Sequence, residues 1–155
     1  EEGYTHSIFG DIFLEDLRKY REDRLSEVGL TGVFPLWKQD TKALVREFIA
    51  LGFKTVTVCV NAKYLDESFV GRVIDEEFLN DLPDNVDPCG EHGEFHTFVY
   101  DGPIFKAPIP ITIGEKVHRT YEVAEGNEDD DCAGAADKDR TWDTGFWYCD
   151  LLPSK

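Results

Sequence analysis

The fold of this chain is decided by residues 40–60, which read DTKALVREFIALGFKTVTVCV. Asp40 is a residue type favoured at a helix N-cap, and Gly52 is the type that most often follows a helix end. Between them, apolar side chains recur at helical spacing, at Leu44, Val45, Phe48, Ile49 and Leu51. The run from Phe53 to Val60 is rich in β-branched residues, which predicts a buried strand of a parallel sheet.

The residues before this stretch add a strand, a helix and a second short strand. Residues 4–9 are typical of a strand, residues 14–28 of a charged amphipathic helix, and residues 33–34 of a strand fragment. The resulting order of strand, helix, strand, helix, strand indicates an α/β protein. We therefore predict a first, α/β domain over residues 1–62.

The pattern changes in the remainder, which we predict to be an α+β domain over residues 63–155 with a mainly antiparallel sheet. A short helix is expected over residues 75–82. Strands are expected at residues 95–100, 109–113, 117–123 and 145–151. Residues 122–140 are acidic, rich in Gly and Ala and weakly apolar, which predicts a mobile surface insertion. The closing strand is aromatic, and we expect it to pack back on the sheet.

The charge balance excludes several classes of partner. The chain has 16 Lys and Arg against 32 Asp and Glu, a net charge of −16, and such a surface repels nucleic acids and anionic membranes. No apolar run approaches the roughly 20 residues of a transmembrane helix. The 4 cysteines are widely spaced, which favours a reducing, cytoplasmic location. Because the chain lacks methionine and opens on Glu1, we expect it to be processed or truncated.

The chemically most informative segment is residues 87–98, Asp-Pro-Cys-Gly-Glu-His-Gly-Glu-Phe-His-Thr-Phe. From Cys89 to His96 it carries two carboxylates, two imidazoles and a thiol, while two glycines allow conformations closed to other residues. This is typical of a functional loop that leads into a buried strand. We expect Glu91, Glu94 and His96 to act in general acid–base catalysis or substrate hydrogen bonding. The same donors suit zinc, but their crowding into one loop does not favour a metal site.

Two other polar stretches follow predicted strands. Gly10 and Asp11 stand where open α/β sheets bind ligands, although Asp11 could equally serve as a helix N-cap. Arg72 could bind a phosphate or carboxylate through two hydrogen bonds, or form a surface salt bridge with Asp75 or Glu76. The sequence contains no P-loop, dinucleotide-binding or nucleophile-elbow motif.

Four motifs occur in one order along the chain: Gly10-Asp11-Ile12, Pro35-Leu36-Trp37, Leu65-Asp66-Glu67-Ser68 with Gly71-Arg72, and Gly90-Glu91-His92-Gly93-Glu94-Phe95-His96-Thr97. Together they resemble the diphthine–ammonia ligase (diphthamide synthase) family of ATP-binding proteins over about residues 5–116. The last motif is the most specific. Family members that act on diphthine usually have Ala in place of Asp11 and commonly Glu in place of His96. We interpret this as a divergent branch of the family.

The resemblance implies an adenine nucleotide alpha hydrolase-like, Rossmann-like parallel sheet, of which this chain holds the C-terminal part, followed by a smaller α+β domain. It also implies ATP and Mg²⁺ as cofactors. A carboxylate acceptor would be activated as an acyl-adenylate, and ammonia would then displace AMP to leave an amide. The family's Ser-Gly-Gly-x-Asp-Ser ATP loop is absent, so we expect this chain alone to be inactive.

By the same resemblance, Glu91, Glu94 and His96 would orient the acceptor carboxyl group and ammonia or transfer a proton. The expected substrate- or nucleotide-binding residues are Gly10, Asp11, Asp66, Arg72, Gly90, Gly93 and Thr97. The expected partners are a nucleotide and a carboxylate acceptor, which can be borne by a protein. Independently of the resemblance, the exposed edge of a truncated sheet would favour a homo-oligomer. Two alternatives stay open: a non-catalytic nucleotide- or partner-binding protein of the same fold, and a metal-dependent hydrolase built on the Cys/Glu/His cluster.

Overall fold

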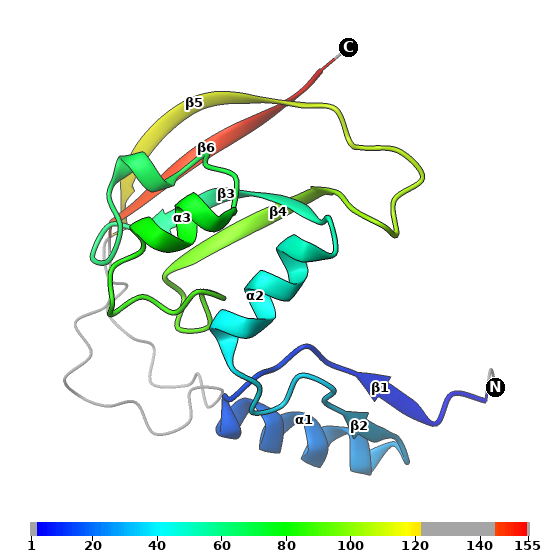
Figure 1. The fold of residues 1–155 in the computed structure, drawn as a ribbon. Helices are drawn as coiled ribbons and strands as arrows, with labels where there is room; N and C mark the ends of the chain where they lie inside the picture. The colour runs from blue at the N-terminus through cyan, green and yellow to red at the C-terminus, as the bar shows by residue number, and fades with distance from the viewer. Residues whose placement is uncertain (1–2, 122–144, 155) are drawn as a thin grey trace. The chain divides into compact units, whose positions relative to one another are not determined.

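The computed structural model describes residues 3–121 and 145–154. These residues form two compact units, of which the first ends at Asp40 and the second begins at Thr41. The first unit contains β1 (His6–Ile8), α1 (Glu15–Glu27) and β2 (Thr31–Val33). β1 and β2 pair in parallel, as the α/β order predicts, and α1 connects them (Figure 1).

Helix α1 is confirmed, but it has no buried apolar stripe. Its arginines instead lie over aromatic rings of the same unit. The Arg21 guanidinium is 4.5 Å from the centre of the Phe9 ring, and Phe9 stacks on Phe34 at 5.4 Å. Arg18 lies 4.6 Å from the Phe34 ring and 4.5 Å from that of Trp37. Cation–π contacts and the aliphatic stems of arginine therefore supply much of the packing between α1 and the rest of the unit.

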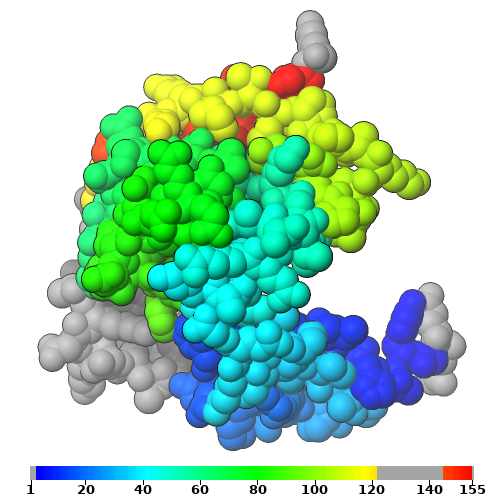
Figure 2. Space-filling model, in the orientation of Figure 1, coloured from blue at the N-terminus to red at the C-terminus, as the bar shows by residue number. Residues whose placement is uncertain are grey.

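The second unit is a four-stranded sheet with helices. In chain order its elements are α2 (Thr41–Ala50), β3 (Lys54–Asn61), the 3₁₀ turn η1 (Glu67–Phe69), α3 (Glu76–Asp81), β4 (Phe95–Asp101), β5 (Ile111–Thr120) and β6 (Gly145–Pro153). The strand order is β4-β3-β6-β5. Helices α2 and α3 adjoin on the surface of this unit (Figure 2).

Strand β3 corrects the prediction of a parallel strand, because it pairs antiparallel with both β4 and β6. A run of β-branched residues indicates that a strand is buried, but it does not indicate the direction of its neighbours. The strand forms a sheet with β4, β5 and β6, so residues 41–62 pack with the second unit. The compact units divide after Asp40, whereas the sequence predicts a boundary after residue 62.

The predicted antiparallel sheet is confirmed, with one change. The strands expected at residues 109–113 and 117–123 form the single strand β5, whose pairing with β6 is irregular between Ile113 and Lys116. The aromatic closing strand β6 packs back on the sheet as an inner strand, as predicted. The insertion expected over residues 122–140 lies outside the described residues.

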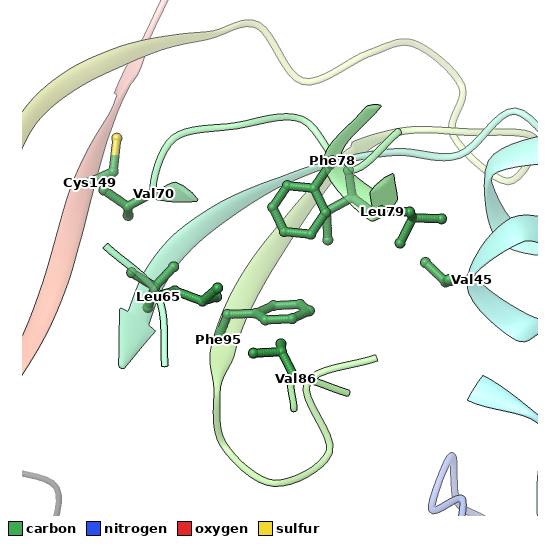
Figure 3. Packing of buried hydrophobic residues seen from close by; sticks show 10 residues of the cluster. Val45, Leu65, Val70, Phe78, Leu79, Val86, Phe95 and Cys149 are labelled. Atoms are coloured by element: carbon green, nitrogen blue, oxygen red, sulfur yellow. The ribbon is translucent and has the colours of Figure 1, made fainter. Parts of the chain in front are cut away.

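The hydrophobic core of the second unit lies between the sheet and the helices (Figure 3). Phe78 of α3 contacts Phe95 of β4 edge-to-face, with ring centres 5.8 Å apart. Val86 and Phe95 are 5 % and 4 % exposed and lie next to each other. These two residues bracket residues 87–94, so the core anchors both ends of the loop that carries the Gly-Glu-His-Gly-Glu motif.

Candidate functional site

The loop of residues 87–94 is organised around the buried carboxylate of Glu94, a residue that is only 1 % exposed. One carboxylate oxygen, Oε1, accepts the backbone N–H of Asp87 at 2.9 Å. The other, Oε2, accepts the backbone N–H of His92, also at 2.9 Å. The Glu94 carbonyl accepts the N–H of Asn61 on β3 at 2.8 Å. Glu94 thus ties the two sides of the loop together and fixes them to the sheet.

Asp87 uses three polar groups within the same loop. Its N–H donates to Glu94, its carbonyl accepts the N–H of Gly90 at 2.8 Å, and its Oδ2 accepts the N–H of Glu91 at 3.0 Å. Sequence reasoning did not select Asp87 as a site residue. The signal that could have found it is the Asp-Pro pair at the start of a glycine-containing turn, because aspartate side chains often accept backbone N–H groups there.

The two glycines of the motif have different requirements. Both have a positive φ, +70° at Gly90 and +80° at Gly93, which is a backbone conformation that residues other than glycine rarely adopt. A Cβ at Gly90 would lie 2.9 Å from the carbonyl oxygen of Phe95, whereas a Cβ at Gly93 would meet nothing within 4 Å. Gly90 is therefore required for both conformation and space, and Gly93 for conformation alone.

The outer part of the loop is accessible to solvent. Glu91 is half-buried, while His92 and Gly93 are exposed. A molecule arriving from solvent can therefore approach Glu91 and His92 but not the Glu94 carboxylate. The two glutamates of the motif differ in burial, although the sequence presents them in equivalent positions beside a glycine.

The structure places His96 and Thr97 on strand β4, after the loop. Because side chains alternate along a strand, His96 leaves the sheet on the face opposite to Phe95, which points into the core. His96 pairs across the sheet with Cys59, and Thr97 pairs with Thr57. Both are exposed. His96 is exposed, whereas Glu94, two residues earlier and just before β4 begins, is buried.

The Cys89 thiol lies at the other end of the loop. Its Sγ is 3.4 Å from the carbonyl oxygen of Thr41, at the start of α2. Among residues 3–121 and 145–154, no three His, Cys, Asp or Glu side chains gather closely enough to hold a metal ion. The Cys/Glu/His cluster on which the hydrolase alternative depends therefore does not form a three-ligand metal site among these residues.

Asp66 and Arg72 make their contacts away from the loop. The Asp66 carboxylate caps η1 by accepting the backbone N–H of Ser68 at 2.8 Å and its hydroxyl at 2.5 Å, and these hydrogen bonds lower the pKa of Asp66. Arg72 pairs with Asp81 at 2.8 Å, not with the two acidic residues that the sequence suggested. Its guanidinium also lies 5.4 Å from the ring of Phe78. The contacts of Asp66 and of Arg72 are of the kinds that surface side chains ordinarily make.

Gly10 and Asp11 belong to the first unit. Asp11 does not cap α1, whose N-cap is Leu14. Its Oδ2 lies 2.8 Å from Nε of Arg21, yet this contact lacks hydrogen-bond alignment, and both atoms are buried without a hydrogen-bond partner. We interpret it as an ion pair of poor geometry. Gly10 is exposed and has ordinary backbone geometry.

A pocket of about 230 Å³ lies beside the start of the loop. Thr41 and Lys42 of α2 form one wall, and Leu79 and Leu82 form another. The remaining lining residues are Pro83, Asp84, Val86 and Pro88. None of the lining residues was selected as a site residue from the sequence, because they come from two stretches, residues 41–42 and 79–88, that only the fold brings together.

The described residues contain no helix that is both long and apolar enough to cross a membrane.

Comparison with known proteins places this loop within a characterised family. Residues 40–129 match the model of the diphthamide synthase C-terminal domain. A diphthine–ammonia ligase of Danio rerio is 31% identical over 126 residues, which cover 76% of this chain and 48% of the relative. The human diphthine–ammonia ligase is 32% identical over 123 residues, which cover 76% of this chain and 46% of the relative. A diphthine–ammonia ligase of Schizosaccharomyces pombe is 32% identical over 116 residues, which cover 69% of this chain and 19% of the relative.

This chain spans less than half the length of these relatives. The matched range nevertheless includes α2, the whole loop of residues 87–94 and most of the sheet. Because the family model covers more than half of the 155 residues, the chain belongs to the diphthamide synthase family.

Proposed function

We propose that this chain forms part of an ATP-dependent ligase that converts a carboxylate into an amide with ammonia. The chain's family membership and the names of its relatives, diphthine–ammonia ligases, support this proposal. The observation that carries it is the loop of residues 87–94, in which a buried carboxylate fixes the backbone while Glu91 and His92 remain accessible.

Within this proposal, the residues of the motif have separate roles. Glu91 and His92 would orient the acceptor or ammonia and take up the proton that ammonia loses when it becomes an amide. Glu94 would not exchange protons with a substrate, because both its oxygens are occupied by backbone N–H groups in a buried site. A direct role for His96 stays a prediction, because β4 directs it to the opposite face from Phe95.

The described residues do not fit the triphosphate of ATP by themselves. Arg72 is paired with Asp81, Asp66 is occupied by Ser68, and Gly10 has no special backbone conformation. We therefore derive no step through ATP or Mg²⁺ from these residues, and propose that the triphosphate is held by residues outside the described ranges. The contribution of this chain would be to the acceptor and ammonia.

The test measures AMP and pyrophosphate released by the protein in its natural full length, with ATP, Mg²⁺, ammonium and a diphthine-bearing acceptor. Release should require both ammonium and acceptor. The Glu91→Gln variant should lose about 10²–10⁴ in rate, as expected for a positioned acid or base. Glu47→Gln, on the exposed side of α2, serves as a matched control and should keep the wild-type rate.

Two outcomes would count against the proposal. If ATP binds but no AMP is released with any carboxylate acceptor, the non-catalytic nucleotide- or partner-binding alternative is favoured. If AMP is released equally well by Glu91→Gln, the loop is not where the chain acts.

A further inference from the structure

We propose that Asp87 and Glu94 are positioning residues that together set the backbone from which Glu91 projects. This inference rests on the proposed function of Glu91, and it assigns a role to Asp87 that the motif itself does not include. Three hydrogen bonds carry it: Asp87 N–H to Glu94 Oε1, His92 N–H to Glu94 Oε2 and Glu91 N–H to Asp87 Oδ2.

The hydrogen bonds form a connected series. Glu94 is fixed to β3 through the bond from Asn61 and holds Asp87 and His92. Asp87 in turn holds Glu91 through its side chain. The N–H groups of two consecutive accessible residues, Glu91 and His92, are thus both bound by carboxylates of the same loop. Their backbone is therefore ordered before any ligand binds. Less conformational entropy is then lost when the substrate binds.

The backbone geometry supports the same arrangement. Pro88 restricts the preceding Asp87 to extended conformations. Gly90 turns the chain back with a φ of +70° and donates its N–H to the Asp87 carbonyl. The Gly93 N–H donates to the Gly90 carbonyl at 3.0 Å. The loop is therefore a closed set of internal hydrogen bonds, and its shape depends on Asp87 at one end and Glu94 at the other.

A role of Asp87 in contact with substrate would predict a different result from a role in positioning. An Asn side chain keeps an acceptor oxygen for the Glu91 N–H but loses the charge, whereas Ala removes the acceptor. A positioning residue should therefore be rescued by Asn, and a charged substrate contact should not. This difference provides a readout that a loss of stability alone cannot imitate.

The first arm of the experiment is kinetic and uses the full-length protein. Asp87→Ala should lower kcat for AMP release by about 10–100-fold with KM changed by less than about threefold, since small misplacements of a reacting group have effects of this order. Asp87→Asn should stay within about threefold of wild type, as should the control Glu47→Ala. A folded Asp87→Ala protein with wild-type kcat, or an Asp87→Asn protein as impaired as Asp87→Ala, would overturn the proposal.

The second arm does not depend on activity. Hydrogen exchange of the Glu91 amide is followed by NMR in the wild type, Asp87→Asn and Asp87→Ala, at temperatures where circular dichroism shows all three to be folded. We expect the Glu91 amide to exchange at least about tenfold faster in Asp87→Ala only. If Asp87→Ala does not fold, the test rests on the wild type and Asp87→Asn. A Glu91 amide that exchanges as fast as an amide without a hydrogen bond in either of these two proteins would overturn the inference. If Glu91→Gln leaves AMP release unchanged, the proposed function is wrong. The exchange rate of the Glu91 amide still tests the positioning role of Asp87 in that case.

Discussion

The loop of residues 87–94 and the segment of residues 65–72 are both polar, both contain acidic residues and glycine, and both belong to the motifs on which the sequence resemblance to the family rests. In the loop, the Glu94 carboxylate is 1 % exposed and accepts two backbone N–H groups from residues remote along the loop. In the segment, the Asp66 carboxylate is exposed and accepts two hydrogen bonds from a single residue, Ser68.

The two carboxylates accept the same number of hydrogen bonds, but they differ in burial and in whether one oxygen or both accept them. In the exposed segment water can replace Ser68 as a donor to Asp66, so the net contribution of these bonds is small. In the buried loop no water can replace the bonds to Glu94, so a lost acceptor leaves a donor unsatisfied. Two motifs that are equally prominent in the sequence therefore contribute differently to the stability of the fold. The following predictions test that difference.

The largest effect is expected for Ala at Gly90. A side chain in its left-handed conformation costs about 1–2 kcal/mol, and contact with the Phe95 carbonyl adds about 1–3 kcal/mol because the backbone cannot move aside. Gly71 of the segment provides the comparison. It has a similar φ of +77°, but its Cβ would meet the Cys149 Sγ at 3.1 Å and an Ile113 methyl group at 3.3 Å. These side chains can shift, so Gly71→Ala should destabilise less.

Gly93→Ala isolates the conformational term, because a Cβ there meets nothing within 4 Å. Urea unfolding of the three variants should rank their destabilisation as Gly90, then Gly71, then Gly93. If Gly71→Ala were the most destabilising, the loop would not be the more rigid of the two regions.

A smaller effect is expected for Arg72→Ala. The pair with Asp81 is only partly shielded, with side chains 27% and 51% exposed, so it contributes about 0–1 kcal/mol. The guanidinium also lies 5.4 Å from the rings of Phe69 and Phe78, which adds about 0.5–1 kcal/mol. Asp81→Asn removes the ion pair and leaves the ring contacts. Thermal unfolding should therefore show a larger decrease for Arg72→Ala than for Asp81→Asn, and equal decreases would show that the ring contacts contribute nothing.

The smallest effect is expected at Asp66, and it should depend on pH. Hydrogen bonds from Ser68 lower the pKa of Asp66 below its ordinary value. A carboxylate whose pKa is lowered on folding stabilises the fold above its unfolded pKa of about 3.9, and this stabilisation is lost as the pH falls through the folded pKa. The difference in melting temperature between wild type and Asp66→Asn should thus be present at pH 6 and vanish in strong acid. A difference that grew as the pH fell would contradict this.

Much of the local structure could be predicted from the sequence. The caps and apolar spacing around α2, the aspartate before α3 and the glycines that follow helices are local signals, and the structure confirms the helices they predict. The Asp75 side chain accepts the N–H of Phe78, as an N-cap should. The direction of β3 could not be predicted, because the same β-branched residues suit a central strand of either kind of sheet.

The candidate site was predictable only in part. The sequence located the loop of residues 87–94, but it could not show that Glu91 and Glu94 differ in burial. That distinction depends on Val86 and Phe95 entering the core on both sides of the loop. Asp87 was missed although the Asp-Pro pair before a glycine-containing turn is a local signal for it. The pocket beside α2 could not be predicted, because only the fold brings residues 41–42 next to residues 79–88.

The most direct test of this account compares Glu94→Gln with Asp66→Asn in urea unfolding at pH 7. Both substitutions replace a carboxylate that accepts two hydrogen bonds by a similar amide. Glu94 is buried and accepts one bond on each oxygen, whereas Asp66 is exposed and accepts both bonds on Oδ1, which Asn keeps. Glu94→Gln should lower the free energy of unfolding by about 1–3 kcal/mol, because the amide NH₂ group faces a buried backbone N–H that then has no acceptor. Asp66→Asn should lower it much less. Equal losses, or a greater loss at Asp66, would contradict the claim that the buried Glu94 carboxylate holds the loop.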